Sequence, residues 1–278
     1  MSVRRAANRA EAARGEVPVI VLDVAVSDVF SERLSSWRDY TSSPWGRVRY
    51  AVVEETLRRE ASRLGTKLRI LDVGGGDGMD ALPLATAGHE VTVLDQSRRW
   101  LDEAERRAAS AGVRIRTVEG DLSSPPALGE FDLVLCHFVL QYRTGGTRDL
   151  MTLADFVRPG GALSLVLPNP VGMVLRQLVT SGPASAFSEL HAETRRAVLF
   201  DHDVRKVEMN ELENALGMVG LSVVRRYGGR IANDLLTDNE AKNEAGYFDD
   251  LLRLELALCD REPYVRVGGM YQIIATKP

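Results

Sequence analysis

A glycine-rich turn with acidic neighbours is the segment of this sequence best suited to chemistry. The run over 71–78 reads LDVGGGDG and lies between an apolar strand-like stretch and a helix-like one. Glycines at such a turn let the backbone approach a ligand, and the following helix N-terminus supplies N–H donors. The residues concerned are Asp72, Gly74, Gly75, Gly76 and Gly78. The turn predicts a ligand-binding loop, with a plain strand-to-helix connection as the alternative.

The spacing of these glycines argues against one kind of nucleotide site. The dinucleotide fingerprint G-x-G-x-x-G, started at Gly74, would place its third glycine at position 79, which is Met79. Here the third glycine is Gly78, so the spacing is G-x-G-x-G. A dehydrogenase is therefore a poor fit.

Two further carboxylates follow the next strand-like runs. Asp95 comes 17 residues after Gly78, at a position where a carboxylate can accept both ribose hydroxyls of an adenosine. Asp121, preceded by Gly120, ends the third run beside the same crevice and is a candidate acceptor for the adenine amino group. A helix N-cap or turn residue is the alternative for Asp121.

From position 68 onward, strand-like and helix-like runs alternate. We expect strands over 67–74, 89–95, 113–121, 131–138, 161–169, 221–229 and 267–278, and helices over 81–88, 98–112, 147–161, 211–219 and 238–259. Strands that alternate with helices of this length predict an α/β fold, a doubly wound and mostly parallel sheet with helices on both faces. The last strand is expected to add to the sheet as an antiparallel edge.

Three segments lie outside this alternation. Residues 1–28 are expected to form a flexible tail, and residues 29–278 a single domain. Within it, 29–65 reads as a helical lid that carries Phe30, Leu34 and Trp37 on one face and is interrupted near Pro44 and Gly46. Residues 170–212 contain helix-like apolar stretches with no strand between them, which predicts an insert that caps the substrate.

Composition restricts the class of protein. The net charge is −4 and the pI about 5.7, so the strongly basic balance of many nucleic-acid-binding proteins is absent. Cys136 and Cys259 each sit in an apolar stretch, as buried thiols in a reducing cytoplasm do. The histidines are scattered and no metal site is expected. No run approaches the roughly 20 apolar residues that span a bilayer, and no secretory signal is evident.

The chain resembles the class I S-adenosylmethionine-dependent methyltransferases over about 66–170. The motifs are LDVGGGDG, the LD that ends at Asp95, the GD at 120–121, FDLVLCHFVLQY and LADFVRPGGALSLVLPN. This resemblance implies a Rossmann-like sheet of seven strands with a reversed final strand. It also implies S-adenosyl-L-methionine as the cofactor.

A closer resemblance, from about Gly46 onward, is to the tRNA 5-carboxymethoxyuridine methyltransferase family. It rests on CHFVLQY, LPNPVGMVL, GGRIANDLL and REPYVRVGGMYQIIATKP. Carried over by position, Arg49 would bind the methionine carboxylate, and Arg230 with Asp234 would belong to a C-terminal element without a known role. The remaining positions implied to contact the cofactor are Gly74, Gly75, Asp95, Gly120, Asp121 and His137.

Methyl transfer from a sulfonium is an in-line displacement, so the protein must align a nucleophile, exclude water and, for some acceptors, remove a proton. His137 is the candidate general base; a histidine that only forms hydrogen bonds in the site is the alternative. Trp45 and Tyr142 are candidate substrate contacts, and Arg230 is a candidate for an anionic group of the substrate. A core aromatic and a surface ion pair are the alternatives for Trp45 and Arg230.

The functional hypotheses differ in the molecule that accepts the methyl group. The chain departs from the tRNA-modifying family at Gly268, Gly269 and Met270 and in the mixed charges of 187–206. With the acidic pI, these departures favour an oxygen or nitrogen of a small-molecule acceptor. A tRNA wobble uridine carboxymethoxy group is the alternative, and a catalytically silent cofactor-binding module is a remote one. The sequence leaves the oligomeric state open.

Overall fold

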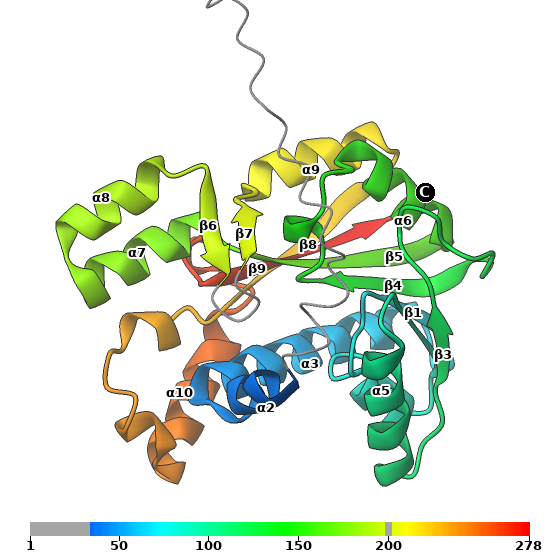
Figure 1. Cartoon of the computed structure of the whole chain (residues 1–278), viewed down its shortest axis with the longest axis horizontal. Helices are drawn as coiled ribbons and strands as arrows, with labels where there is room; N and C mark the ends of the chain where they lie inside the picture. The colour runs from blue at the N-terminus through cyan, green and yellow to red at the C-terminus, as the bar shows by residue number, and fades with distance from the viewer. Residues whose placement is uncertain (1–33, 198–201) are drawn as a thin grey trace, which may run out of the picture.

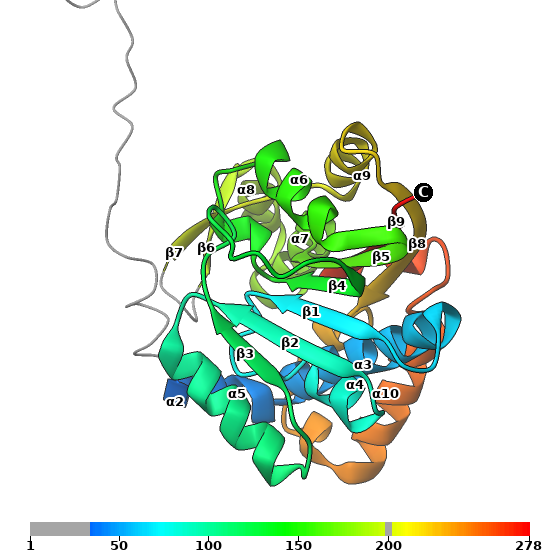
Figure 2. The ribbon, with the colours of Figure 1, turned by 90° about the vertical axis from the view of Figure 1, so that its right-hand side faces the viewer.

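The computed structural model describes residues 34–197 and 202–278. The predicted tail over 1–28 lies outside these ranges. Within them a twisted seven-stranded sheet has helices packed on both of its faces (Figures 1 and 2). The strands of this sheet are β1 (Arg69–Val73), β2 (Glu90–Asp95), β3 (Arg116–Glu119), β4 (Phe131–His137), β5 (Val157–Pro168), β8 (Ser222–Gly229) and β9 (Met270–Thr276). The predicted α/β fold class, doubly wound and mostly parallel, is confirmed.

The strand order across the sheet is β3-β2-β1-β4-β5-β9-β8. The pairs among β1 to β5 are parallel, whereas β9 runs antiparallel to both of its neighbours. The expectation of an antiparallel edge strand is therefore wrong in one respect. The last strand is reversed, but it is inserted between β5 and β8, and β8 forms the edge.

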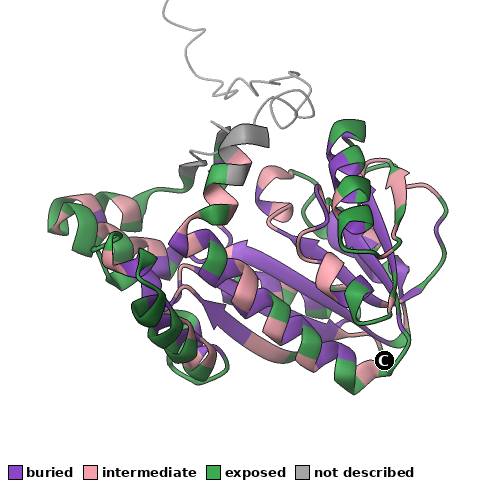
Figure 3. Ribbon diagram, turned by 90° about the horizontal axis from the view of Figure 1, so that it is seen from below, coloured by how far each residue is buried: buried purple, intermediate pink, exposed green. Residues whose placement is uncertain are grey.

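Successive side chains of a strand point to opposite faces, and this alternation creates two cores. Leu71 and Val73 of β1 belong to the core under α6 (Thr147–Phe156) and α9 (Met209–Met218). Ile70 belongs to the core under α3 (Pro44–Leu64), α4 (Leu82–Thr86) and α10 (Ala245–Leu258). Both faces are covered, so the central strands are buried almost throughout (Figure 3).

Two helices precede the sheet, in the segment predicted as a helical lid. α2 (Leu34–Ser42) is followed by α3, and the expected interruption near Pro44 and Gly46 is reduced to one capping residue. Ser43 accepts a hydrogen bond from the Gly46 amide, and Pro44 occupies the first turn, where a missing N–H costs nothing. A Cβ at Gly46 would lie 2.1 Å from the Tyr40 carbonyl oxygen, so glycine permits the close approach of α2.

Two helices are shorter in the structure than the sequence predicts. The helix expected over 147–161 stops at Phe156, and β5 begins at Val157 instead of near 161. The helix expected over 238–259 is a 3-10 turn, η3 (Ala241–Asn243), followed by α10. The helix predicted over 98–112 is α5 (Arg98–Ser110), and shorter 3-10 turns are η1 (Leu140–Tyr142), η2 (Asn233–Leu235) and η4 (Tyr264–Arg266).

The segment over 170–212 is helical at first, as expected, with α7 (Pro170–Ser181) and α8 (Pro183–His191). The expectation that it contains no strand is wrong. A small antiparallel hairpin, β6 (Thr194–Ala197) and β7 (His202–Arg205), precedes α9. None of the described helices combines the length and apolar character needed to cross a membrane.

Candidate active site

A cavity of about 1630 Å³ opens at the carboxyl-terminal edge of the parallel strands. In doubly wound sheets this edge is where ligands bind. The candidate site residues on its wall are Trp45, Arg49, Asp72, Gly74, Gly75, Gly76, Asp95, Gly120, Asp121, His137, Tyr142, Arg230 and Asp234. Gly78 of the glycine-rich turn is not among the lining residues. The structure thus brings together residues that are far apart in the sequence, whereas their individual roles remain predictions.

The glycine-rich loop needs its glycines for two physical reasons. Gly74 has φ of +67°, which L side chains rarely adopt, and a Cβ there would lie 2.5 Å from Val139. A Cβ at Gly75 would lie 2.5 Å from an Asp72 carboxylate oxygen. The loop therefore leaves its backbone open toward the cavity and keeps room for the Asp72 carboxylate beneath it.

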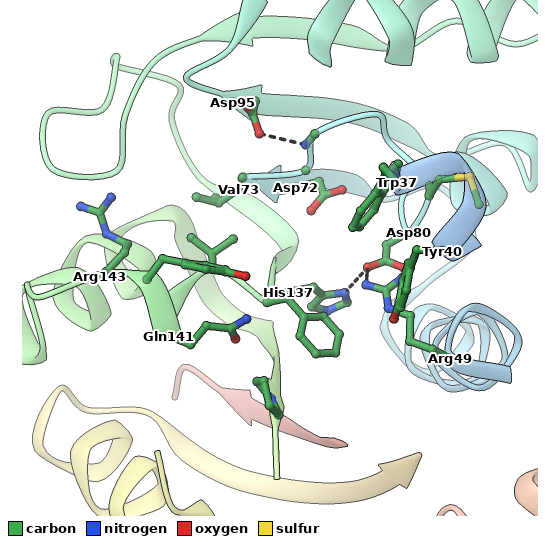
Figure 4. A pocket seen from close by; sticks show the side chains of 18 of the residues that line it. Trp37, Tyr40, Arg49, Asp72, Val73, Asp80, Asp95, His137, Gln141 and Arg143 are labelled. Atoms are coloured by element: carbon green, nitrogen blue, oxygen red, sulfur yellow. Dashed lines mark hydrogen bonds and ion pairs between the residues drawn. The ribbon is translucent and has the colours of Figure 1, made fainter. Parts of the chain in front are cut away.

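Asp95 stands at the end of β2 and holds the loop in place. Its Oδ2 accepts a hydrogen bond from the Gly76 amide at 3.0 Å, and its Oδ1 accepts one from the Ser97 amide at 2.9 Å (Figure 4). Burial raises the pKa of Asp95, although these two amides oppose the shift. A carboxylate accepts more than two hydrogen bonds, so the geometry fits a ligand that offers hydroxyl donors.

Asp121 follows β3 on the same wall and is half-buried. Its Oδ1 accepts from the Ser123 amide, and its Oδ2 lies 3.2 Å from the Arg143 guanidinium. Burial alone would raise the pKa of Asp121, but the Ser123 bonds and Arg143 outweigh it and lower the pKa. The turn-residue alternative is thus partly realised, since Asp121 bonds to Ser123 while it also faces the cavity.

Asp72 at the end of β1 is the least satisfied carboxylate of the site. It is 2% exposed, and its Oδ2 has no hydrogen-bond partner among the described residues. Burial, together with the nearby carboxylates of Asp80 and Asp95, raises its pKa well above the ordinary value. An orphaned carboxyl oxygen that can accept a hydrogen bond fits a ligand with a cationic or N–H donor group, as the amino group of a methionine moiety is.

Asp80 organises the wall opposite Asp95, and the sequence analysis missed it. Its carboxylate accepts two hydrogen bonds from Arg49, at 2.5 and 2.6 Å, and lies 2.9 Å from Nδ1 of His137 (Figure 4). Burial would raise the pKa of Asp80, but Arg49 and His137 outweigh it and lower the pKa well below the ordinary value. The available signal was its position, two residues after the last glycine of the loop.

Arg49 lies on α3 and not on a loop, because the segment over 44–64 is helical. Its guanidinium lies 4.0 Å from the centre of the Tyr50 ring and 5.0 Å from that of Phe138. These contacts and the fork with Asp80 fix the cation at the cavity wall. The position of Arg49 at the cavity is as expected.

His137, at the end of β4, is held from both sides. Because the Asp80 carboxylate only accepts hydrogen bonds, Nδ1 of His137 is the donor to it. Nε2 lies 2.8 Å from the Ser164 hydroxyl, and Gln272 donates to that hydroxyl at 2.9 Å. A neutral ring with its proton on Nδ1 satisfies every one of these bonds. His137 would have to release a partner to act as a general base, so the geometry favours the alternative role of a hydrogen-bonding residue.

A second contact that the sequence did not reveal ties α2 to the glycine loop. The indole Nε1 of Trp37 donates to the Asp77 carboxylate at 2.9 Å, and Trp37 packs edge-on against Trp100 of α5. Burial raises the pKa of Asp77, opposed by Arg107 and Trp37. Trp37 was expected only on the apolar face of a helix. In the structure it is a wall residue of the cavity (Figure 4).

A metal centre has no obvious place in this site. Within the ranges 34–197 and 202–278, no group of three or more histidine, cysteine, aspartate or glutamate side chains is arranged to hold a metal ion. Both cysteines are buried and free, and burial raises the pKa of the Cys259 thiol to about 11.

The sheet topology, the glycine loop and the carboxylates at the strand ends define a nucleoside-binding α/β protein. Comparison with known proteins narrows this class. Residues 70–161 match the family described as "Methyltransferase domain". The tRNA 5-carboxymethoxyuridine methyltransferase of Escherichia coli (strain K12) is 29% identical over 263 residues, which cover 90% of this chain and 95% of that protein.

Two further matches are shorter or more distant. The ubiquinone biosynthesis O-methyltransferase of Rickettsia akari (strain Hartford) is 27% identical over 114 residues, 41% of this chain and 45% of that protein. Among solved structures, the magnesium protoporphyrin IX methyltransferase from Synechocystis PCC 6803, with bound SAH, aligns with a TM-score of 0.63. It is 17% identical, and the alignment covers 91% of this chain and 98% of that one.

This chain is an S-adenosylmethionine-dependent methyltransferase with the class I fold. Its cofactor is S-adenosyl-L-methionine. The residues on the cavity wall fit that cofactor, because the orphaned oxygen of Asp72 suits its amino group and Asp95 suits its ribose hydroxyls.

Proposed function

We propose that this enzyme transfers the methyl group of S-adenosylmethionine to an oxygen or nitrogen of a small-molecule acceptor. The observation that carries the proposal is the scarcity of charged residues in α7 and α8. These helices contribute Met173, Gln177 and Glu189 to the cavity wall. Residues 170–191 contain one arginine and one glutamate. Their exposed large apolar side chains are Val171, Leu178, Val179, Phe187 and Leu190, and Arg176 is their exposed basic side chain. A nucleic-acid surface would instead need clustered lysine and arginine.

The size of the cavity supports two ligands side by side. Pockets for one small molecule typically measure about 300–1,000 Å³, and this cavity, at about 1630 Å³, is larger. We propose that the cofactor occupies the end beside the glycine loop and that the acceptor occupies the end beside α7. In this arrangement residues 170–212 act as the substrate cap, and α2 with α3 act as the lid on the cofactor side.

The cofactor supplies a methyl group already activated by its cationic sulfur. The chain then has to hold the acceptor in line and keep water away, which accounts for a large share of the rate in such displacements. The buried cluster of Arg49, Asp80 and His137 forms a fixed wall for this purpose. Trp45 and Tyr142, on the same wall, remain candidate contacts to the acceptor.

The alternative acceptor is the carboxymethoxy group of a tRNA wobble uridine. One observation favours it: the similarity to the Escherichia coli tRNA enzyme extends over 95% of that protein and is not confined to the cofactor-binding half. We retain it as the second candidate. The buried free cysteines also support our proposal of a reducing compartment, the cytoplasm.

The experiment uses S-adenosylmethionine with a labelled methyl group and the full chain. One sample receives a small-molecule extract, and another receives total tRNA with or without ribonuclease. Label in small molecules alone supports the proposal. Ribonuclease-sensitive label in tRNA overturns it in favour of the second candidate, and tight cofactor binding without any transfer would identify a silent binding module.

Two matched variants define the background of this assay. Asp95→Ala removes a carboxylate from the cavity wall and is expected to abolish transfer to every acceptor. Asp102→Ala removes an exposed carboxylate of α5, outside the cavity, and is expected to retain full activity.

A further inference from the structure

The cavity wall carries buried oxygens that the protein leaves without a partner. Three of them form neither a hydrogen bond nor an ion pair with a described residue: Oη of Tyr50, Oδ2 of Asp72 and Oε1 of Gln141. Buried polar groups in folded proteins almost always have a partner, so each exception needs a physical reason. The cofactor's amino group accounts for Asp72, and the Arg49 guanidinium, 4.0 Å from the ring centre, accounts for the position of Tyr50. Gln141 has no such explanation within the protein.

Both ends of the Gln141 carboxamide are free. The side chain is 5% exposed, its Oε1 is unpaired, and its Nε2 donates to no described residue. Gln272, at 3% exposure, shows the same side chain fully paired. Its Oε1 accepts from Thr56 at 2.6 Å, and its Nε2 donates to Ser164 at 2.9 Å. A buried polar group without partners destabilises the folded chain, so the ligand-free enzyme is less stable at Gln141 than a bound ligand would make it.

The turn that carries Gln141 keeps it from finding a partner elsewhere. η1 follows β4 through Phe138, whose φ of +56° is rare for a residue other than glycine. Val139 then lies directly on the glycine loop, since a Cβ at Gly74 would be 2.5 Å from it. The Tyr142 amide donates to the Val139 carbonyl at 3.0 Å and closes the turn. Strained backbone of this kind gathers at functional sites, and here it fixes the direction of the Gln141 side chain.

Gln141 lies at the junction between the two ends of the cavity. β1 and β4 are neighbouring parallel strands, and the chain continues from them in opposite directions across the sheet, from β1 to β2 and from β4 to β5. The crevice between two such strands is where doubly wound proteins bind their ligands. η1 contacts the glycine loop through Val139 on the cofactor side, and it packs against β7 of the insert on the other side. Figure 4 shows the Gln141 side chain directed toward His137 in this crevice.

The chemistry of the carboxamide suits the acceptor better than the cofactor. The cofactor's amino group and ribose hydroxyls already have matching carboxylates in Asp72 and Asp95. A carboxamide is uncharged and offers a carbonyl acceptor and two N–H donors. A half-turn of the amide exchanges its two ends without changing the shape of the side chain, so either end can serve a ligand. It does not take up a proton near neutral pH, and Gln141 can therefore bind and orient a ligand but cannot act as a base.

We propose that Gln141 binds the methyl acceptor at an uncharged hydrogen-bonding group, namely a hydroxyl, an amide or a ring nitrogen. This inference rests on the proposed function, because it takes the end of the cavity beside α7 as the place of the acceptor. A site that hydrogen-bonds a substrate group rejects analogues without that group far more strongly than an apolar pocket rejects a missing methylene. Gln141 is therefore a specificity-determining residue that orients the acceptor in front of the methyl donor.

The test compares Gln141→Leu with the natural full chain in the labelled-methyl assay. Leucine keeps a similar side-chain volume and removes both ends of the amide. At limiting acceptor, we expect the rate of label transfer to fall at least about tenfold, because the bonded group of the acceptor is left without its partner. The affinity for S-adenosylhomocysteine, measured by calorimetry, should stay the same.

Melting temperatures of the ligand-free proteins separate this role from a structural one. Gln141→Leu removes an unpaired buried group and should melt at or above the temperature of the natural chain. Gln272→Leu is the matched comparison: it removes a buried glutamine whose two ends are bonded, and it should melt clearly lower. Asn214→Leu changes an exposed amide of α9 outside the cavity and should match the natural chain in melting temperature and in transfer rate.

Three results would overturn the proposal. One is a Gln141→Leu variant that melts as low as Gln272→Leu, and another is a variant that transfers label at the natural rate. The third is a loss of S-adenosylhomocysteine affinity as large as the loss in rate, which would place Gln141 in the cofactor site.

Failure of the proposed function is visible separately, in the natural chain. If the natural chain labels tRNA alone, the proposed function fails, whereas tenfold slower labelling of tRNA by Gln141→Leu still supports Gln141 as a contact to the acceptor. Absence of label in every sample overturns both. Once the acceptor is identified, an analogue that lacks the bonded group should react equally slowly with the natural chain and with Gln141→Leu.

Discussion

Replacement of Asp72 by asparagine is expected to stabilise the cofactor-free protein and to weaken its cofactor binding. Asp72 is almost completely buried and has an oxygen without a partner in the described structure. Burial and neighbouring carboxylates, Asp80 foremost, raise its pKa. Asparagine has nearly the same shape and never ionises. The substitution therefore removes the unfavourable free energy of burying an ionisable carboxyl group, which destabilises the cofactor-free enzyme.

The size of the stability difference between Asp72→Asn and the natural chain follows from proton linkage. A carboxyl whose folded pKa is raised contributes stability below its unfolded pKa of about 3.9, and this contribution is lost as pH rises toward the folded pKa. In that window the unfolded natural chain releases a proton that the folded chain retains, at about 1.4 kcal/mol per pH unit. The advantage of Asp72→Asn should therefore be about 0.5 kcal/mol at pH 4 and about 1.5 kcal/mol at pH 5. It should level off at the folded pKa of Asp72.

Urea unfolding of both proteins without cofactor, from pH 3 to pH 8, measures this difference. Asp132→Asn is a control for which we expect the opposite change in the free energy of unfolding. Burial would raise the pKa of Asp132, but the Arg69 amide and the Arg158 guanidinium outweigh it and lower the pKa. That variant should lose stability at neutral pH, and its deficit should shrink as pH falls below about 4.

Calorimetric titration with S-adenosylhomocysteine gives the second half of the prediction. The loss of one charge-assisted bond should weaken cofactor binding to Asp72→Asn by at least about tenfold. A stability difference that stays flat across the pH range, or a variant less stable than the natural chain at pH 7, would refute the reasoning. Unchanged cofactor affinity would remove Asp72 from the cofactor site.

Two other substitutions test the packing of the site. Asp80→Asn leaves the buried Arg49 guanidinium without its counter-ion, and urea unfolding should show a loss of about 3–5 kcal/mol. Gly269→Ala places a Cβ 2.2 Å from the Asp234 carboxylate and should lower the melting temperature, whereas Gly246→Ala, which meets nothing within 4 Å, should be neutral or slightly stabilising. Equal melting temperatures for the two alanine variants would contradict the packing argument.

The cofactor half of the site could be predicted from sequence because its signals are local. Glycines at a strand-to-helix turn and carboxylates at strand ends are fixed by the pattern of the chain itself. Parallel topology then places all the carboxyl ends of the strands at one edge. The same logic located His137, although not the two partners that hold its ring.

The buried network around His137 was beyond sequence reasoning because its members come together only in the folded chain. Asp80, Ser164 and Gln272 stand on a loop and two different strands, and none belongs to a local motif. Thr56 on α3 extends the network further with a hydrogen bond to Gln272 at 2.6 Å. Periodicity shows that such a residue lies in an element, but not which side chain it will meet.

Strand positions were predicted better than strand neighbours. The pattern over 267–278 marked a final strand, but hydrophobic alternation carries no information on where that strand enters the sheet. The β6 and β7 strands were missed because TRRA and HDVR lack an apolar alternation. The start of β5 was misjudged because Pro159 and the glycines after it form an irregular stretch opposite Phe131 and Leu133, within the strand itself.

The insertion of β9 between β5 and β8 has a consequence for how the protein is made on the ribosome. Within the described sheet, β9 (residues 270–276) is the strand that forms hydrogen bonds with both β5 and β8. While they are still in the exit tunnel, β8 has no partner and β5 presents an open hydrogen-bonding edge. The first five strands can assemble during synthesis, but closure of the acceptor end, with Arg230 and Gly269, must wait until residue 276 has left the tunnel.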